Sequence, residues 1–370
     1  MGVLLSFFLL FSLGGYSQDI RNHGDVNNDG TVNVTDVVDL VDIIMKKSDA
    51  NTNNPLANNN FSVKKVYGDG NTYCAFTSLI KRDGVYYLAF REAATHVSAG
   101  DYGVIRILKS LDGDKWEVFQ TISLKDADLR DPNLSEMPNG KLLLICGARI
   151  LSNSGSYETR TVFSKENEKG VFDDLRPVNI PEQFYWKTCS WVWKLTWYKG
   201  YGYGICYGDG NIVLLRTSDG INYELVQRLD ISDNPTEACV QFKSDDTAIA
   251  MVRRNNNGYI GNAAFPYNEW NWKELDIYLA GQNFVLLDNN IYVVTRMTQN
   301  VGDRTVIWRG NVDGEFNSCY VLPYGGKSGH SDTAYAGIIV EDNQLLISYY
   351  AIENDGKPCV YIAKIKQSFY

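Results

Sequence analysis

The segment Asp83–Phe90 has the sequence DGVYYLAF, in which an Asp-Gly turn is followed by an apolar run. Apolar residues alternate before the turn as well, so the segment predicts a β-hairpin. The same pattern recurs along the chain about every 45 to 60 residues. The turns are Asp83-Gly84, Asn139-Gly140, Lys199-Gly200, Asp245-Asp246, Asn289-Asn290 and Asp342-Asn343. The second runs are Val85–Phe90, Lys141–Cys146, Tyr201–Cys206, Thr247–Val252, Ile291–Thr295 and Gln344–Tyr349.

A hairpin repeated at this spacing is typical of propeller blades rather than of a β-sandwich. No helical period of useful length interrupts the repeats. We therefore predict an all-β fold, a six-bladed β-propeller over residues 61–370. Because neighbouring blades cover both faces of each sheet, we expect continuous apolar strands such as Leu142–Ile145.

A second kind of turn falls between the halves of some repeats. Residues 110–116 have the sequence SLDGDKW, residues 217–223 have TSDGINY, and Asp313-Gly314 with Phe316 is a fainter copy. A Ser or Thr hydroxyl before an Asp-Gly turn closes a hairpin, and the aromatic residue packs beneath it. These segments resemble the Asp-box of sialidases, shortened by one residue. The resemblance implies a propeller of sialidase type, while the motif itself is structural and assigns no activity.

Residues 25–36, DVNNDGTVNVTD, carry oxygen side chains at loop positions one, three, five, nine and twelve. Gly30 occupies the sixth position, where such a loop turns sharply, and apolar residues at helical spacing follow from Val37 to Ile44. The pattern predicts an EF-hand-like loop and helix holding a structural Ca²⁺; the alternative is a solvated Asn/Asp loop. The predicted ligands are Asp25, Asn27, Asp29, Thr31, Asn33 and Asp36.

Residues 24–47 resemble one repeat of a dockerin, a module that normally has two. The resemblance implies a protein contact through this half-dockerin, or a role restricted to ordering the N-terminal segment. Residues 1–17 contain a short apolar run followed by small residues, which predicts a signal peptide and a secreted or periplasmic protein with no membrane span. We thus expect a signal peptide (1–17), a calcium-loop module (18–48), an Asn-rich linker (49–60) and the propeller (61–370).

The composition narrows the choice of partners. A net charge of −9 over 370 residues argues against nucleic acid. The 24 Tyr and 8 Trp residues suit stacking on sugar rings, although aromatic residues also fill the cores of β-rich proteins. The 7 Cys residues form no CxxC pair and fall in apolar strand patterns, so we expect buried free thiols rather than a zinc site.

In a propeller, loops from many blades converge at one end of the central channel, so a site is assembled from residues far apart in sequence. Several Arg residues stand at predicted strand ends, and guanidinium groups bind carboxylates in a bidentate manner. The alternative is that each Arg pairs with a nearby acid on the surface. The candidate substrate-binding residues are Arg91, His96, Arg130, Asp131, Arg253, Arg296, Arg304 and His330.

Residues 74–366 resemble the sialidases, in which a last-blade Tyr is the nucleophile and a Glu activates it. The resemblance assigns these roles to Tyr335 and Glu237, and the acid/base role to Asp101. It also implies that Arg253 and Arg304 hold a substrate carboxylate and that Asp131 lies beside the sugar. A neutral phenol avoids repulsion by an anionic substrate, but its pKa near 10 requires a neighbouring carboxylate to remove the proton.

One position departs from the sialidase pattern. Thr77 stands where the family has its first carboxylate-binding Arg, and Arg91 is the nearest replacement. We therefore predict a secreted sialidase-like hydrolase of complex glycans, exo-acting and retaining, with a sugar other than sialic acid among its substrates. Catalysis is expected to need no cofactor. The alternatives are another propeller glycan enzyme, such as a lyase using His96 or His330, and a non-catalytic carbohydrate-binding propeller.

Overall fold

The structure is a computed structural model that describes residues 61–366, apart from 98, 99, 101, 152–154, 288, 299–302, 327–331, 354 and 355. The signal peptide, the calcium loop and the linker lie outside the described residues, as do Asp101 and His330. The described chain is all-β, and its one helical element is the 3₁₀ helix η2 (Glu182–Phe184). No helix within it has the length and hydropathy to cross a membrane.

Four of the sheets contain four antiparallel strands each, and in three of them the strands follow the order of the chain. These three are β2 (Tyr73–Arg82), β3 (Val85–Ala93), β4 (Val104–Ser110) and β5 (Glu117–Ile122); β14 (Ala238–Phe242), β15 (Ala248–Val252), β16 (Tyr259–Ala263) and β17 (Asn271–Glu274); and β18 (Asn283–Leu287), β19 (Asn290–Met297), β20 (Arg304–Gly310) and β21 (Phe316–Gly325). The fourth combines both ends of the described chain: β22 (Ala334–Glu341), β23 (Gln344–Ala351), β24 (Cys359–Lys366) and β1 (Phe61–Tyr67).

The remaining strands form one larger sheet in which two groups of four are joined by β8 and β10. The groups are β6 (Ala127–Glu136), β7 (Leu142–Leu151), β8 (Tyr157–Lys165) and β9 (Arg176–Pro177), then β10 (Cys189–Tyr198), β11 (Tyr201–Gly208), β12 (Asn211–Thr217) and β13 (Tyr223–Arg228). The short β9 pairs with β8 only at Val162 and Phe163. Backbone groups further along that edge still need partners, and Cys189 and Ser190 pair in parallel with Thr159 and Arg160.

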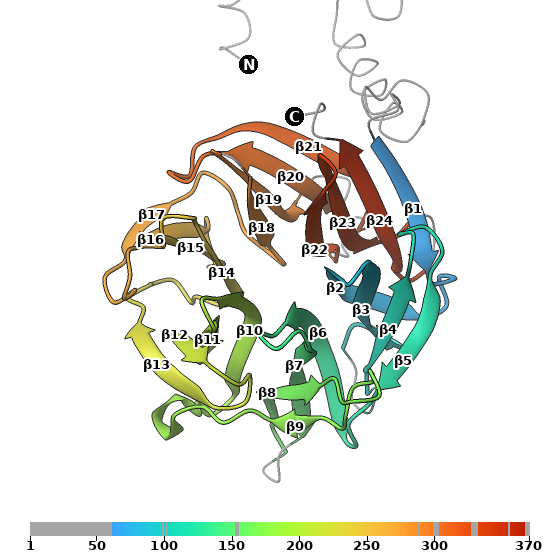
Figure 1. Ribbon diagram of the computed structural model, residues 1–370, viewed down its shortest axis with the longest axis horizontal. Coiled ribbons are helices and arrows are strands. Elements are labelled where there is room, and N and C mark those ends of the chain that lie inside the picture. Colours follow the sequence, from blue (N-terminus) through green and yellow to red (C-terminus); the bar gives the residue numbers. More distant parts are fainter. Residues whose placement is uncertain are drawn as a thin grey trace, which may run out of the picture. The chain divides into compact units, whose positions relative to one another are not determined.

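The sheets are arranged around a common centre, with the first strand of each group innermost (Figure 1). Contacts run from β2 to β6, on to β10, β14, β18 and β22, and back to β2, so the inner strands form a closed ring. The ring is closed at its outer edge by β1, which pairs antiparallel with β24. This arrangement is a β-propeller in which the chain's first described strand completes its last sheet.

The predicted turns fall where the repeat pattern placed them. Each of the hairpin turns, from Asp83-Gly84 to Asp342-Asn343, connects the first and second strand of its group. The Asp-box-like turns connect the third and fourth strands. In one of them Asp219 Oδ1 accepts the amides of Ile221 and Asn222 at 2.8 Å each, and Asp112 Oδ1 accepts those of Asp114 and Lys115 in the same way.

The core lies between neighbouring sheets, as the apolar strands predicted. Leu142–Ile145 are completely buried. One cluster joins Leu79 and Leu88 of one sheet to Leu346 and Val360 of the next. The cysteines are free thiols, with five of the seven buried and Cys189 and Cys319 half-buried, which confirms that prediction.

Four inner strands share an irregularity that positions the site. The pairing registers of β2, β6, β10 and β22 shift near their amino ends, after Ala75, Arg130, Val192 and Ala334. Three of the bulges contain a non-glycine residue with positive φ, namely Phe76 (60°), Asp131 (44°) and Tyr335 (48°). β-bulges redirect side chains out of the regular alternation. Residues that would otherwise face the sheets are thereby directed to the centre of the ring.

The bulge at Tyr335 requires a glycine two residues later. A Cβ added at Gly337 would overlap the backbone nitrogen and the Cβ of Leu79 on the neighbouring inner strand. We predict that Gly337→Ala lowers the free energy of unfolding by about 1–3 kcal/mol, because a backbone atom has little freedom to move away. Denaturant unfolding measures the loss, with Ser62→Ala on exposed β1 as control. Equal stability of the two variants would contradict the packing described here.

Candidate active site

The bulged residues of four inner strands meet at one place. Phe76 and Thr77 of β2, Asp131 and Pro132 of β6, Trp193 and Lys194 of β10, and Tyr335 of β22 line a small void of about 10 Å³. Phe76 and Tyr335 pack edge to face, with ring centroids 4.8 Å apart. Equivalent bulges on successive strands thus build a single site from residues up to 259 positions apart.

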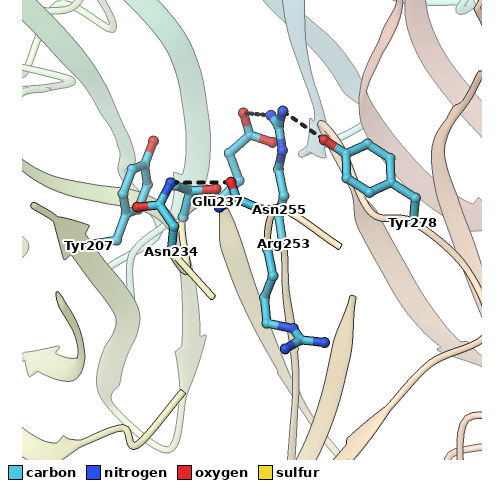
Figure 2. Close-up of a pocket in the computed structure, with 8 residues that line it drawn as sticks. Tyr207, Asn234, Glu237, Arg253, Asn255 and Tyr278 are labelled. Atoms are coloured by element: carbon cyan, nitrogen blue, oxygen red, sulfur yellow. Dashed lines mark hydrogen bonds and ion pairs between the residues drawn. The ribbon is translucent and has the colours of Figure 1, made fainter. Parts of the chain in front are cut away.

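Tyr335 and Glu237, which the sequence analysis paired as nucleophile and base, are in direct contact. The Tyr335 hydroxyl donates a hydrogen bond of 2.5 Å to Glu237 Oε1. Glu237 directly precedes β14, and its Oε2 accepts the Gly281 amide at 2.8 Å. Arg253, just after β15, donates from Nη1 to Glu237 Oε1 at 2.9 Å and from Nη2 to Tyr278 at 3.0 Å. Figure 2 shows the guanidinium between the carboxylate and the Tyr278 phenol.

These contacts set opposite charge preferences on the two partners. Burial by itself opposes ionisation of Glu237, but the charge of Arg253 and the hydrogen bonds from Tyr335 and the Gly281 amide lower its pKa below the ordinary value. Burial and then the charge of Glu237 raise the pKa of Tyr335 well above its usual value. At neutral pH the pair is therefore a neutral phenol donating to a carboxylate, and Glu237 is the acceptor available for the phenol's proton.

Beside this pair lies a pocket of about 220 Å³. It is lined by Tyr207, Asn234, Thr236, Glu237, Arg253, Arg254, Asn255 and Tyr278. Asn234 and Asn255 face each other across part of its wall, with a hydrogen bond of 3.4 Å (Figure 2). The lining is mostly polar and includes two aromatic rings, a mixture that suits the hydroxyl groups and apolar faces of a sugar.

Asp131 lines the same small void as Tyr335. Trp193 Nε1 donates to Asp131 Oδ2 at 2.8 Å. Burial, and after it the charge of Glu237, raise the pKa of Asp131 to about 7. Lys194 lines the same void, and burial lowers its pKa. Asp131 thus holds its proton in neutral solution far more readily than an exposed Asp, and offers a hydroxyl donor next to the phenol.

A second cluster packs against Phe76. His96 Nδ1 is 2.5 Å from Asp332 Oδ2 and 2.7 Å from the Tyr73 hydroxyl. The Tyr350 hydroxyl donates to the other oxygen of Asp332. The Phe76 ring packs edge to face on His96 with centroids 5.6 Å apart and also on Tyr350, so one ring connects this cluster to Tyr335.

The remaining arginines have different environments. Arg296 lies 3.3 Å from Asp303 and 3.8 Å from Asp332. Arg304 donates only to the backbone carbonyls of Asp303 and Gly326 and makes no ion pair with a described residue. Arg130 donates to Asp128 at 3.1 Å, and its guanidinium lies 5.5 Å from the centre of the Phe76 ring.

The structure corrects the prediction for Arg91. Its side chain is completely buried and forms an ion pair of 2.8 Å with Asp128, so it has no surface to offer a substrate. It anchors Asp128, which in turn holds Arg130. Thr77 is also buried; its hydroxyl donates to the Tyr335 carbonyl at 2.9 Å and therefore supports the bulge instead of binding a carboxylate.

Of the predicted site residues, the structure brings together Tyr335, Glu237, Arg253 and Asp131, and it places His96, Arg130 and Arg296 in the adjoining cluster. Five residues of the site were missed: Tyr73, Phe76, Trp193, Lys194 and Tyr278. Asp332 and Tyr350 stand in candidate segments of the last blade, but no role was predicted for them. Asp332 stands only three residues before Tyr335, which was a usable signal. Phe76 and Trp193 gave none, because an aromatic residue in an apolar strand looks like core until a bulge redirects it.

The sequence matches no family model and no curated protein. Among solved structures, a protein of unknown function from Dyadobacter fermentans DSM 18053 is similar in fold, with a TM-score of 0.70 and 16% identity over 83% of this chain and 99% of that one. The phage phi92 endosialidase has a TM-score of 0.63 and 11% identity over 83% of this chain and 69% of that one. Trypanosoma rangeli sialidase in complex with sialic acid has a TM-score of 0.59 and 11% identity over 82% of this chain.

The chain spans 58% of that sialidase's length. At these identities the likeness is one of fold. The chain is accordingly a β-propeller with sialidases and an endosialidase among its structural neighbours, which makes glycan-acting propeller enzymes the group to compare it with.

The raised pKa of Asp131 has a consequence for stability. The folded state keeps this proton up to about pH 7, whereas an unfolded Asp loses it near pH 4. Folding stability contributed by the protonated carboxyl is therefore lost as the pH rises through this window. We predict that the free energy of unfolding of Asp131→Asn, taken relative to that of wild type, is higher at pH 8 than at pH 4.5 by on the order of 2 kcal/mol. The reason is that the variant has no charge to bury at the higher pH.

Urea unfolding at the two pH values measures this difference. Asp313→Asn, in an exposed turn, serves as the control for the Asp-to-Asn substitution itself. A stability of Asp131→Asn that tracks wild type at both pH values would show that Asp131 is ionised when buried.

Proposed function

We propose that this chain is a secreted, sialidase-like glycoside hydrolase, built as a six-bladed propeller, that releases terminal sugars from complex glycans with retention of configuration. The observation that supports this most is the 2.5 Å hydrogen bond between Tyr335 and Glu237, residues 98 positions apart. A phenol held against a carboxylate that an arginine and a backbone amide fix in place has the arrangement of an activated nucleophile.

In the proposed reaction, Tyr335 attacks the anomeric carbon while Glu237 takes the phenol proton. The bond to the leaving oxygen breaks, a general acid of the site gives that oxygen a proton, and a glycosyl-tyrosine intermediate forms. Water then attacks the same carbon and gives a proton back to that acid, now acting as a base, while the bond to Tyr335 breaks and Glu237 returns the proton to the phenolate. Two displacements at one carbon give net retention. The protonated Asp131 and the polar lining of the larger pocket would position the sugar.

The arrangement of the arginines favours an anionic sugar as the substrate, and this sugar need not be sialic acid. Arg304 has no carboxylate partner among the described residues and retains its charge for a ligand, and Arg253 sits at the pocket with Glu237. The first carboxylate ligand of the sialidase pattern is replaced by the buried Thr77. A substrate carboxylate would therefore have fewer guanidinium contacts than in sialidases, which favours a related acidic sugar that binds with fewer ion pairs.

Tyr335→Phe and Glu237→Gln test the assignment. Both are expected to lower kcat/KM on a fluorogenic glycoside by at least about 100-fold, because the first removes the nucleophile and the second its proton acceptor. The matched controls are Tyr201→Phe, at the exposed first residue of β11, and Glu224→Gln in a surface ion pair, and both should retain full activity. Wild-type activity in Tyr335→Phe would rule out the proposed nucleophile.

Two product measurements separate the alternatives. Proton NMR of the released sugar should show the retained anomer first, and a 2-fluoro glycoside should add one sugar mass to wild type but not to Tyr335→Phe. An unsaturated product absorbing in the ultraviolet would instead indicate a lyase. Saturable glycan binding by calorimetry with no product from any glycoside would indicate a binding propeller.

We also propose that the loop Asp25–Asp36 binds one Ca²⁺ and gives the secreted protein a contact for a partner. Its support is the spacing of hard oxygen ligands in the sequence. Titration of the full chain with Ca²⁺ should show one site that Asp25→Ala abolishes, while Asp49→Ala in the linker leaves it intact. Unchanged calcium binding in Asp25→Ala would exclude this loop.

A further inference from the structure

The cluster around His96 has a geometry that the nucleophile and its base do not use. Both contacts of the imidazole are made by Nδ1, to Asp332 and Tyr73, and Nε2 makes no hydrogen bond with a described residue. The side chain is 45% exposed, whereas Asp332 is 12% exposed. One nitrogen is thus held by buried groups while the other is directed away from them, and the ring lies one aromatic residue, Phe76, from Tyr335.

We propose that His96 and Asp332 form the proton-donating dyad of this site, with His96 Nε2 protonating the leaving oxygen and Asp332 resupplying the ring through Nδ1. The proposal rests on the proposed hydrolase function and names the acid/base that it needs. It gives His96 the role that the sequence resemblance gave to Asp101. Tyr73 and Tyr350 are positioning residues, since they hold the ring and the carboxyl without facing the substrate.

The proton inventory of the pair is consistent with this role. Burial, followed by the charges of Arg130, Arg91 and Arg296, lowers the pKa of His96 to about 4. Burial raises the pKa of Asp332 to about 7, with the Tyr350 hydrogen bond acting in the opposite direction. The favoured form at pH 6 is then a protonated Asp332 donating to Nδ1 of a neutral imidazole, which leaves the ring proton on Nε2.

Every proton in the two steps has a donor and an acceptor. As the glycosidic C–O bond breaks, Nε2 gives its proton to the leaving oxygen and Asp332 passes its own to Nδ1. The dyad is left as a carboxylate beside a neutral imidazole. In the second step Nε2 takes a proton from the attacking water, Nδ1 returns one to Asp332, and the Tyr335–carbon bond breaks. The sum is one glycoside and one water converted to a sugar and an alcohol.

The groups facing the dyad set its pH dependence. These groups are Tyr73 (β2), Arg91 (β3), Asp128 and Arg130 (β6), Arg296 (β19), Asp303 (just before β20) and Tyr350 (β23). Three of them are permanent cations, which favour loss of the dyad's proton, whereas burial favours its retention. Asp128 and Asp303 pair with those cations and partly offset them.

Leaving-group dependence tests the proposal. A proton donor matters for an alkyl or sugar leaving group and hardly at all for a nitrophenolate, which departs without protonation. We predict that His96→Gln and Asp332→Asn lower kcat/KM by about 100-fold or more on an alkyl or oligosaccharide glycoside and by less than about 5-fold on the nitrophenyl glycoside of the same sugar. His23→Gln, in the N-terminal segment, is the histidine control and should act as wild type on both.

Two further measurements distinguish a proton donor from a residue that only maintains the structure. Wild-type kcat/KM on the alkyl glycoside should fall above about pH 7 as the dyad loses its proton, and this limb should be absent from Asp332→Asn. Azide needs no general base, so it should restore turnover of the nitrophenyl glycoside by His96→Gln and yield a glycosyl azide. Circular dichroism and thermal unfolding verify that each variant is folded.

Equal losses on the two glycosides, or no loss on either, would overturn the dyad. Asp101→Asn tested in parallel would also overturn it, if that variant alone showed the leaving-group dependence. Failure of the proposed function is separate, because Tyr335→Phe is expected to abolish turnover of both glycosides whichever residue is the acid. Activity retained in Tyr335→Phe would refute the hydrolase mechanism itself.

Discussion

The antiparallel pairing of β1 with β24 closes the propeller, and the geometry of the site follows from that closure. The pairing joins Phe61 to Ile365 and so makes one sheet from the two ends of the described chain. With that sheet complete, β22 contacts β2, and the inner strands form a closed circuit. A closed circuit fixes the distance across the channel, and this is why Tyr335 can lie within a hydrogen bond of Glu237 although 98 residues separate them.

Within that circuit, local backbone geometry decides which side chains face the centre. A regular strand alternates its side chains between the two sheet faces. The bulges in β2, β6, β10 and β22 break the alternation at equivalent places, and Phe76, Asp131 and Tyr335 adopt left-handed conformations there. Such conformations cost free energy and persist where the surroundings fix them. Here the buried Thr77, hydrogen-bonded to the Tyr335 carbonyl and to Ser348, provides part of that fixation.

Three buried carboxyl groups near the channel have different charges because their partners differ. Glu237 has Arg253 and a backbone amide within hydrogen-bonding distance, and its pKa is lowered. Asp131 accepts a hydrogen bond from the Trp193 indole, and Asp332 contacts His96 and Tyr350, with the cation of Arg296 farther away at 3.8 Å, so burial dominates and raises both pKa values to about 7. One site therefore contains a carboxylate that accepts protons beside two carboxyl groups that can donate them.

The all-β class, the positions of the hairpin turns, the Asp-box-like turns and the buried thiols could be predicted from the sequence, because turn chemistry and strand alternation are local properties. Its resemblance to sialidases also identified Tyr335, Glu237 and Arg253 as partners. The burial of Arg91 on Asp128, the support that Thr77 gives to a bulge, and the place of Phe76 and Trp193 in the site could not be predicted in this way. Burial, bulge direction and the neighbour of a charged group are set by strands that are distant in sequence and meet once the ring has closed.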